Sequence, residues 1–472
     1  MYLGLDLGTS SLKALLVDAD QAVVAEATAP LTVERPQSGW SEQDPDAWVR
    51  ACEAAVGSLD ADLSAVRAIG LAGHMHGATL VGADDRALRP CLLWNDTRAG
   101  AEAAALDDAE ARRITGNIVF PGFTAPKAEW VRQHEPEIWA KVARILLPKD
   151  YLRLWLTGEA VSEMSDAAGT AWLDTGARAW SEALLARQGL GRGHMPRLVE
   201  GSEVSGRLRD EVADRLGLPR GTPIAGGAGD NAAAAIGTGA VAPGQGFVSL
   251  GTSGVLFVSS AAFQPDADSA VHTFCHAVPD TWHQMGVILS ATDSIEWAAR
   301  LTGRPAAELT GGDLQAPGRT LFLPYLGGER TPHNDTGVRA SLLGIEHATD
   351  APALGRAVMA GVAYALRDCR DALAATGTPV GRVLAVGGGA RSDHWLRMIA
   401  TVLNHPLEVP AGGAFGAALG ACRLAMMADG AGPEVAEAPP VERIVEPDAA
   451  LVDAYAEGHA RFRAAYAPVR DL

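Results

Sequence analysis

The stretch MYLGLDLGTSSLKALLVD, residues 1–18, returns in part as GFVSLGTSGVLFV at residues 246–258. In both copies an apolar run leads into Gly-Thr-Ser, and a second apolar run follows. The alternation of leucine with other residues from Leu3 to Leu7 indicates a half-buried strand, and Gly and Ser are frequent in tight turns. The repeat therefore predicts two α/β halves, each beginning with a hairpin whose turn is Gly-Thr-Ser.

The length and the position of the repeat indicate how the chain is divided. At 472 residues the chain is too long for one ordinary core. A glycine-rich segment at 237–244 is typical of a hinge, so we expect one domain at 1–241 and a second at 242–472. Further strands are expected at 12–17, 22–27, 66–72 and 382–386, and helices at 44–59, 126–134, 180–188, 209–216, 232–236, 393–403, from 412 onward and at 449–466.

Composition excludes several classes of function. The formal net charge of −18 argues against a nucleic-acid or anionic-membrane surface, and no apolar run is long enough to span a bilayer. The opening residues lack the features of a signal peptide. The five cysteines are odd in number and form no C-x-x-C pair, which is typical of reduced thiols in the cytoplasm. We therefore expect a cytoplasmic enzyme or binding protein that has no nucleic-acid or membrane partner.

The two Gly-Thr-Ser turns are candidate phosphate-binding sites. Such a turn offers consecutive backbone N–H groups and two hydroxyls to an anion, although a single copy is also common in ordinary hairpins. Two copies that face each other could hold adjacent phosphates. The P-loop pattern and G-x-G-x-x-G are both absent from the sequence, and lysine is scarce. A nucleotide would therefore be bound by these turns rather than by either familiar loop.

Two aspartates are candidates for the chemistry. Asp6 lies on the strand face opposite the leucines, next to the first turn, where a carboxylate could hold Mg²⁺ beside a phosphate. The alternative is an exposed strand residue that bonds only the hairpin. Asp230 follows a run that contains Gly226, Gly227 and Gly229 and precedes an alanine-rich helix. It could accept the proton of an attacking hydroxyl, or it could simply be the N-cap of that helix.

Three further segments could line a ligand site. Met75 and His76 come just after the strand at 66–72, where open α/β sheets bind their ligands. The Trp-Asn-Asp sequence at 94–96 combines an aromatic ring with polar groups, as sugar sites do. The segment at 387–392, Gly-Gly-Gly-Ala-Arg-Ser, could approach a flat ring or a phosphate. Each also has a plain alternative: a surface histidine, a turn with a buried anchor, and a tight strand-to-helix turn.

Taken in order, these segments resemble the FGGY carbohydrate kinases from Met1 to about Leu424. The pair Met75-His76 and the surroundings of Trp94 are similar to the branch of the family that phosphorylates D-xylulose. Where that branch usually has Gln before Met-His, this chain has His74, which bears on fine sugar selectivity. The resemblance rests on LGLDLGTSSLKALLVD, GHMHGATLV, CLLWNDTR, GNIVFPGFTAPK, LLPKDYLRLWLTGE, SDAAGTAWLD, GGAGDNAAAAIGTG, SLGTSGVLF, LPYLGGERTPHND and GGGARSDHWLRMIA.

The resemblance implies two ribonuclease-H-like (actin-like ATPase) domains that flank a deep catalytic cleft. ATP with Mg²⁺ would bind along the second domain, and the ketose would bind against the first. The implied roles are Asp230 as general base; Asp6 near Mg²⁺ and the transferring phosphate; Met75, His76, Asp230 and Asn231 at the sugar; Thr9, Lys13, Gly251 and Thr252 at the phosphates; and Gly389 and Asp393 at the adenosine.

The expected reaction is ATP-dependent phosphorylation of D-xylulose to D-xylulose 5-phosphate, in a protein that forms a homodimer as the family does. A kinase for another ketose or polyol, such as D-ribulose, L-ribulose or glycerol, is the first alternative. An actin-like ATPase that drives assembly is a second, and a catalytically silent sugar sensor is a third.

Overall fold

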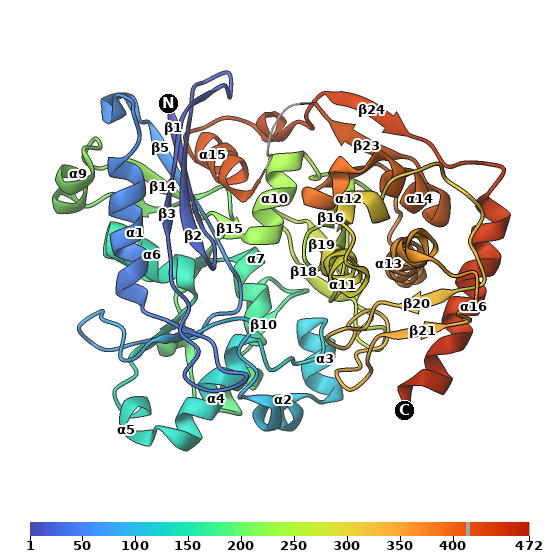
Figure 1. The fold of residues 1–472 in the computed structure, drawn as a ribbon. Coiled ribbons are helices and arrows are strands. Elements are labelled where there is room, and N and C mark those ends of the chain that lie inside the picture. Colours follow the sequence, from blue (N-terminus) through green and yellow to red (C-terminus); the bar gives the residue numbers. More distant parts are fainter. Residues whose placement is uncertain (412–415, 472) are drawn as a thin grey trace.

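The protein consists of two α/β domains side by side (Figure 1). The computed structural model describes residues 1–411 and 416–471. Each domain contains a mixed seven-stranded sheet. The first sheet has the order β13-β14-β5-β1-β2-β3, with β15 paired to β5, and the second has the order β18-β19-β17-β16-β22-β23-β24. The predicted pair of α/β halves is therefore confirmed.

The strands and the main helices have the following bounds. The first sheet is formed by β1 (Tyr2–Leu7), β2 (Ser11–Val17), β3 (Val23–Pro30), β5 (Ala68–Gly73), β13 (Val204–Arg207), β14 (Pro223–Ala225) and β15 (Ala228–Gly229). The second is formed by β16 (Gly246–Leu250), β17 (Gly254–Ser260), β18 (His272–Cys275), β19 (Trp282–Ile288), β22 (Val383–Val386), β23 (Leu407–Pro410) and β24 (Val441–Val445). The helices used below are α1 (Pro45–Gly57), α3 (Ala109–Thr115), α4 (Thr124–His134), α6 (Pro148–Thr157), α9 (Asp210–Leu216), α10 (Asp230–Thr238), α11 (Thr292–Thr302), α13 (Ala351–Ala375), α14 (Asp393–Leu403), α15 (Ala417–Ala428) and α16 (Val452–Arg470).

The internal repeat extends beyond the two hairpins. β1 pairs antiparallel with β2 across the turn at 8–10, and β16 pairs antiparallel with β17 across the turn at 251–253. On its other side β1 pairs parallel with β5, and β16 pairs parallel with β22 in the same way. Each Gly-Thr-Ser turn therefore lies at the carboxyl end of the central strand of its sheet, beside the end of a parallel neighbour.

Helix α15 crosses from the second half of the sequence to the first sheet, as its red ribbon among the blue strands in Figure 1 shows. The leucines of β1 face α1, whereas Gly4 of β1 and Gly70 of β5 face α15. A Cβ added at Gly4 would lie 2.2 Å from the carbonyl oxygen of Ala418, and one at Gly70 would lie 1.8 Å from that of Ala421. Glycine at these positions therefore lets the helix lie directly on the strands.

Gly70→Ala is expected to lower the free energy of unfolding by about 1–3 kcal/mol, because the new methyl group overlaps backbone that cannot move independently. Urea denaturation measures the change. Gly57→Ala is the matched control, since a Cβ at Gly57 has nothing within 4 Å. We expect that variant to match or slightly exceed the wild-type stability. Equal midpoints for the two variants would contradict the close packing of α15.

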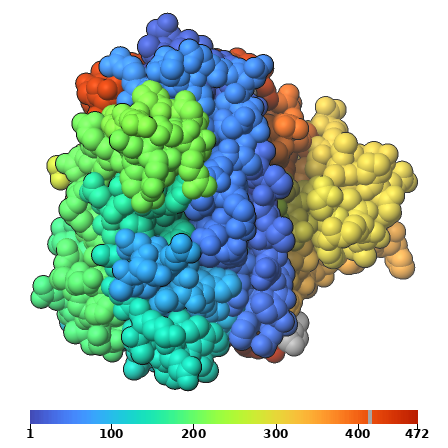
Figure 2. Space-filling view, turned by 90° about the vertical axis from the view of Figure 1, so that its left-hand side faces the viewer, coloured from blue at the N-terminus to red at the C-terminus, as the bar shows by residue number. Residues whose placement is uncertain are grey.

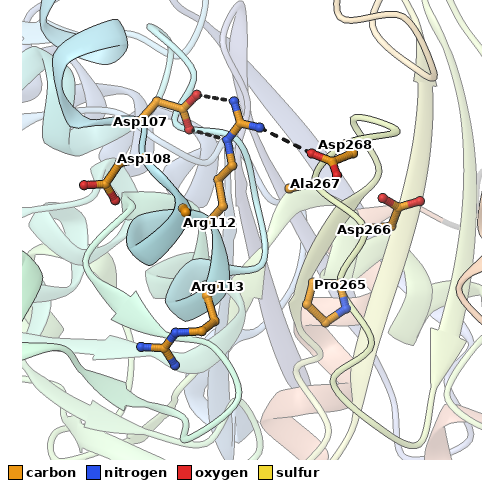
Figure 3. Close-up of a pocket in the computed structure, with 9 residues that line it drawn as sticks. Asp107, Asp108, Arg112, Arg113, Pro265, Asp266, Ala267 and Asp268 are labelled. Atoms are coloured by element: carbon orange, nitrogen blue, oxygen red, sulfur yellow. Dashed lines mark hydrogen bonds and ion pairs between the residues drawn. The ribbon is translucent and has the colours of Figure 1, made fainter.

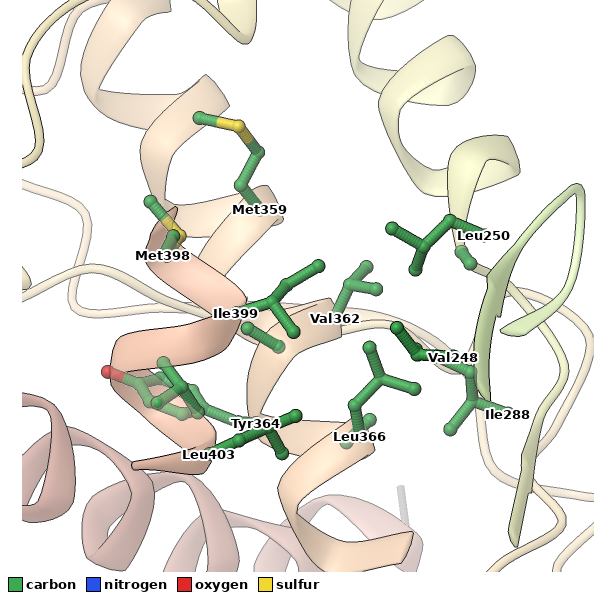
Figure 4. Packing of buried hydrophobic residues seen from close by; sticks show 14 of the residues in the cluster. Val248, Leu250, Ile288, Met359, Val362, Tyr364, Leu366, Met398, Ile399 and Leu403 are labelled. Carbon is green, nitrogen blue, oxygen red and sulfur yellow. The ribbon is translucent and has the colours of Figure 1, made fainter. Parts of the chain in front are cut away.

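The core of the second domain lies between its sheet and helices α13 and α14 (Figure 4). Val248 and Leu250 of β16 and Ile288 of β19 point toward the helices from the sheet. Val362 and Ile399 meet them from α13 and α14, and all five side chains are less than 1% exposed. This packing holds β16, and with it the second Gly-Thr-Ser turn, on a rigid base.

Most of the elements expected from sequence are present, with shifted ends. The helix expected at 44–59 is α1, whose N-cap Asp44 accepts a hydrogen bond from the N–H of Asp46. The helix expected at 393–403 has those bounds. The start expected at 412 lies outside the described residues, and α15 begins at Ala417.

All five cysteines are buried, and none of them forms a disulfide. No helix in the described part of the chain is long and apolar enough to cross a membrane.

Candidate active site

Three neighbouring strands bring the predicted catalytic and sugar-binding residues to one edge of the first sheet. β1 and β15 both pair parallel with β5, one on each side, with Asp6 opposite Ala72 and Gly229 opposite Gly73. Asp6 is near the end of β1, and Asp230 follows β15 directly. Two strand spacings, about 10 Å, separate β1 from β15. The two aspartates therefore flank the end of β5, where open α/β sheets bind ligands.

The two carboxylates influence each other's ionisation. Burial raises the pKa of Asp6, the charge of Asp230 raises it as well, and against the opposing effect of Lys13 the pKa is about 6. Burial also raises the pKa of Asp230 to about 6, and hydrogen bonds from Asn231 oppose this. Both carboxylates therefore titrate close to neutral pH, as groups that bind or exchange protons during catalysis do.

Asp230 does not cap its helix. The N-cap of α10 is Gly229, and Asp230 is the first helical residue. Its Oδ1 accepts hydrogen bonds from the backbone N–H of Asn231 at 2.8 Å and from the Nδ2 of the same residue at 3.1 Å. The N-cap interpretation of Asp230 is therefore wrong, and Asn231 orients the carboxylate.

Met75 and His76 are held by glycines on facing segments. A Cβ at Gly229 would lie 2.7 Å from the Cγ of Met75, and a Cβ at Gly169 would lie 2.5 Å from the Nδ1 of His76. His76 has a left-handed backbone, with φ of 71°, and its ring stacks on Phe123 with centroids 4.6 Å apart. Both side chains are thus fixed by close contacts, and Met75 lies against the residue that precedes Asp230.

The protonation state of His76 follows from its contacts. Its Nδ1 lies 2.7 Å from the carbonyl oxygen of Gly169, so Nδ1 must carry the proton. Burial lowers the pKa of the ring, nearby cations including Lys127 lower it as well, and against the opposing hydrogen bond to Gly169 the pKa is about 3. His76 is therefore neutral at physiological pH, and its Nε2 is a free acceptor for a sugar hydroxyl.

His74, the departure from the family pattern, does not reach a ligand directly. Its ring is 2% exposed and packs edge-on against Trp48, with centroids 6.0 Å apart. Burial lowers the pKa of His74 to about 3, so this ring is neutral as well. Any influence of His74 on sugar selectivity is therefore indirect, because protein encloses the ring.

The two Gly-Thr-Ser turns are anchored differently. In the first turn, Thr9 accepts hydrogen bonds from the side chains of Gln43, at its carbonyl, and of Trp94, at its hydroxyl, both at 3.0 Å. In the second, the carbonyl of Gly251 accepts hydrogen bonds from the N–H and hydroxyl of Thr292, at the start of α11. Thr252 is exposed. The bond from half-exposed Trp94 joins the 94–96 segment to the first turn, which the sequence did not indicate.

The remaining predicted contacts have more ordinary surroundings. Lys13 lies across the hairpin from Asp6 and pairs with Glu26 at 2.7 Å. Gly389 is buried, and a Cβ there would lie 2.8 Å from that of Leu250, so packing alone requires this glycine. Asp393 is exposed and pairs with Arg443. The roles of Lys13, Gly389 and Asp393 toward a nucleotide stay predictions.

A buried ionic network lies behind the segment that carries Asp230, and sequence reasoning missed it. Lys149 of α6 contacts Asp150 at 2.7 Å, Asp166 at 3.3 Å and Glu163 at 3.4 Å, and all four side chains are fully buried. Burial lowers the pKa of Lys149, but the three carboxylates raise it more, so the ammonium stays charged. Burial raises the pKa of Asp166 well above its ordinary value, which favours its protonated form.

The network reaches the catalytic segment through two side chains. Arg153 donates hydrogen bonds to the carbonyl of Ala225 at 2.7 Å and to that of Gly226 at 2.5 Å. Ser165 accepts one from the N–H of Gly229 at 3.1 Å, while its own hydroxyl donates to Glu163 at 2.8 Å. These bonds fix the backbone that leads to Asp230.

A cavity of about 510 Å³ lies at the domain boundary, between α3 and the segment at 265–268 (Figure 3). Arg112 spans it, pairing with Asp107 at 2.6 Å and with Asp268 of the second domain at 3.5 Å. Four aspartates and two arginines line the cavity, so its charge would repel a polyphosphate. The lining residues are Asp107, Asp108, Ala109, Arg112, Arg113, Pro265, Asp266, Ala267 and Asp268.

Comparison with known proteins agrees with the duplicated architecture. The N-terminal-domain model of the FGGY family of carbohydrate kinases matches residues 1–237, and the C-terminal-domain model matches residues 246–428. The chain belongs to the FGGY family of carbohydrate kinases.

Relatives of this FGGY kinase match over its full length. The xylulose kinase of Escherichia coli is 46% identical over 481 residues, covering 99% of this chain and 98% of that protein. A solved structure described as a xyloylose kinase from Brucella ovis is 56% identical, with a TM-score of 0.98 over 100% of this chain and 99% of the other. A gluconate kinase structure from Lactobacillus acidophilus has a TM-score of 0.93 at 23% identity, covering 99% of this chain and 98% of its own, and shows the shared fold alone.

The space-filling view shows how the domains of this FGGY kinase meet (Figure 2). The first domain, blue to green, fills most of that face. A yellow lobe of the second domain projects beyond it, with a hollow between the two. The fold is thus the predicted pair of domains that flank a cleft.

Proposed function

We propose that the protein transfers the γ-phosphoryl group of ATP to the C5 hydroxyl of D-xylulose, which yields D-xylulose 5-phosphate and ADP. One arrangement carries this proposal: Asp230 and Asp6 flank the end of β5, and Met75, the residue before neutral His76, packs against Gly229. The choice of D-xylulose is supported by the full-length similarity to xylulose kinases.

In this proposal, ionised Asp230 accepts the proton of the C5 hydroxyl as its oxygen attacks the phosphorus. Met75 packs on the carbon face of the sugar, the Nε2 of His76 accepts a hydrogen bond from a hydroxyl, and Asn231 keeps the carboxylate oriented. The N–H groups of the two Gly-Thr-Ser turns, together with Lys13, face the phosphates. Closure of the domains excludes water, which would otherwise compete as the acceptor.

Mg²⁺ is part of the proposal, with Asp6 as the protein group that holds it. The donor set fits, since Asp6 is an oxygen ligand whose pKa is raised partly by the neighbouring negative charge of Asp230. Across the described ranges no group of three or more His, Cys, Asp or Glu side chains could hold a metal, so water and phosphate oxygens would supply the further ligands. When bound, Mg²⁺ neutralises charge on the phosphates.

The value of kcat/KM for D-xylulose is expected to fall as the pH drops through 6 and to approach a roughly tenfold loss per pH unit below that, because protonated Asp230 cannot accept the substrate proton. Above pH 7 the carboxylate is fully ionised and this limb is flat. Initial rates of ADP release between pH 5 and 8 measure the profile. Constant kcat/KM down to pH 5 would contradict the assignment of Asp230.

The substrate itself is tested by ADP release with D-xylulose, D-ribulose, L-ribulose and glycerol at equal concentrations. We expect D-xylulose to have the highest kcat/KM. A higher value for another sugar would replace the proposed substrate and leave the mechanism in place. ATP hydrolysis that no sugar stimulates would favour an actin-like ATPase, and the absence of any turnover would favour a sugar sensor.

The proposal also covers assembly, domain limits and location. We expect a homodimer with domain limits at 1–241 and 242–472, and a cytoplasmic enzyme. A mass of one chain, 49.0 kDa, in sedimentation velocity at micromolar concentration would contradict the dimer.

A further inference from the structure

Arg330 is a second-domain residue whose backbone is rigidly held. It lies between β20 (Leu321–Leu323) and β21 (Ser341–Leu343), and its N–H donates to Oε1 of buried Glu329 at 2.7 Å. That oxygen also accepts a hydrogen bond from the N–H of Leu289 at 3.0 Å. The next residue, Thr331, donates from its hydroxyl to the carbonyl of Ala270 at 3.0 Å. The start of the Arg330 side chain is therefore fixed relative to the second sheet.

The side chain of Arg330 reaches the first domain. Its guanidinium carbon lies 3.8 Å from the ring centre of Phe120. Burial lowers the pKa of Arg330 to about 10, while the Glu329 charge opposes this, so the group stays charged. Among residues 1–411 and 416–471, no acceptor takes a hydrogen bond from its guanidinium and no carboxylate lies within ion-pair distance. Arg330 is half-buried, and the free N–H donors of its guanidinium are accessible to a ligand.

The surroundings of Arg330 lead directly to the sugar-binding residues. Phe120 packs edge-on against Phe123, with centroids 5.4 Å apart, and Phe123 stacks on His76. His272 of the second domain packs on Phe120 with centroids 5.1 Å apart. The charge of Arg330 contributes to the lowered pKa values of both histidines, so it acts within short electrostatic range of His76.

We propose that Arg330 binds the ketose and favours it over the corresponding polyol, by donating to the C2 carbonyl and the adjacent C1 hydroxyl while Asp230 faces the C5 hydroxyl. The planar fork of guanidinium donors matches two neighbouring oxygens on one sugar. This inference rests on the proposed function. It adds a contact from the second domain, so that the bound sugar joins both sides of the cleft.

The test compares full-length Arg330→Met with the wild type, using D-xylulose and its reduced form, xylitol. For D-xylulose we expect kcat/KM to fall about 10- to 100-fold, as for loss of hydrogen bonds from a charged group, with most of the change in KM. For xylitol the loss is smaller, so the preference for the ketose shrinks. Arg330→Lys keeps the positive charge but lacks the planar guanidinium donors. We expect its preference for D-xylulose over xylitol to lie between those of the wild type and Arg330→Met.

Arg112→Met is the matched control, because Arg112 also joins the two domains but does so through ion pairs with Asp107 and Asp268 at the acidic cavity (Figure 3). Arg112→Met should keep the wild-type preference for D-xylulose over xylitol. If Arg330 had a purely structural role, Arg330→Met would lower the melting temperature and change the rate of sugar-free ATP hydrolysis. It would also reduce the turnover of D-xylulose and xylitol equally. That result, or an unchanged KM for D-xylulose in Arg330→Met, overturns the proposal. Failure of the wild type to phosphorylate D-xylulose would instead contradict the proposed function, and this inference with it.

Discussion

Asp230→Asn is expected to reduce kcat about 10²- to 10⁴-fold and to stabilise the fold at the same time. The loss of turnover has the size of a general-base contribution, because the amide cannot take the proton of the attacking hydroxyl. Sugar and ATP binding should persist, since an amide oxygen can still accept the hydrogen bonds that Asn231 donates to the carboxylate. Steady-state ADP release measures the loss of turnover. Calorimetric titration with ATP measures whether ATP binding persists.

The gain in stability follows from the raised pKa of Asp230. At about 6, this pKa lies above the ordinary 3.8, so the folded protein holds the proton more tightly than the unfolded chain does. Stability from this group is complete below pH 3.8 and is lost as the pH rises through 6. At pH 7.5 the ionised carboxylate therefore costs about 1–3 kcal/mol, which an asparagine avoids.

Asp210→Asn is the control for both effects, because Asp210 is also the first residue of a helix, α9, but is exposed. It should change neither turnover nor stability by a measurable amount. Near-normal turnover in Asp230→Asn would remove Asp230 from the mechanism. A loss of stability in that variant at pH 7.5 would contradict the burial of a charged carboxylate.

Lys149→Met is expected to lower the free energy of unfolding by about 3–5 kcal/mol, since it leaves buried carboxylates without their cation. Turnover should fall as well, because Arg153 and Ser165 of the same network hold the backbone that leads to Asp230. Urea denaturation followed by tryptophan fluorescence gives the first quantity.

Lys141→Met provides the comparison, as Lys141 is exposed and its replacement should change stability by no more than about 0.5 kcal/mol. If Lys149→Met does not fold, the double variant Lys149→Met with Asp150→Asn removes one charge of each sign and should recover part of the loss. Equal midpoints for Lys149→Met and Lys141→Met would show that the network contributes nothing to stability.

The parts of the site that were predicted from sequence share one property: they follow strands of a single sheet. Asp6, Met75, His76 and Asp230 each follow or end a β-strand, and neighbouring parallel strands necessarily bring their carboxyl ends together. The repeated hairpin could also be predicted, because a turn between two strands with alternating apolar residues is a local sequence pattern. The order of strands and turns along the chain was therefore sufficient to predict the residues at the carboxyl ends of these strands.

The parts that were missed depend on contacts between distant segments. Gly4 and Gly70 were visible as glycines within strands, a sign of close approach, but nothing in the sequence named α15 as the partner. The 25-residue helix α13 was not predicted either, although it forms much of the second core. Arg330 belongs to a stretch that resembles the family, yet its contact with Phe120 lies 210 positions away and has no local signature.

The crossing of α15 has a consequence for synthesis on the ribosome. The first sheet has its glycine face bare until Ala428 has emerged, roughly 190 residues after the end of α10. At about 5–20 residues per second, this interval lasts roughly 10–40 s. Throughout it the nascent chain presents an apolar sheet surface to its surroundings. A molecular chaperone therefore has a defined window in which to act, and the N-terminal domain, although made first, is completed almost last.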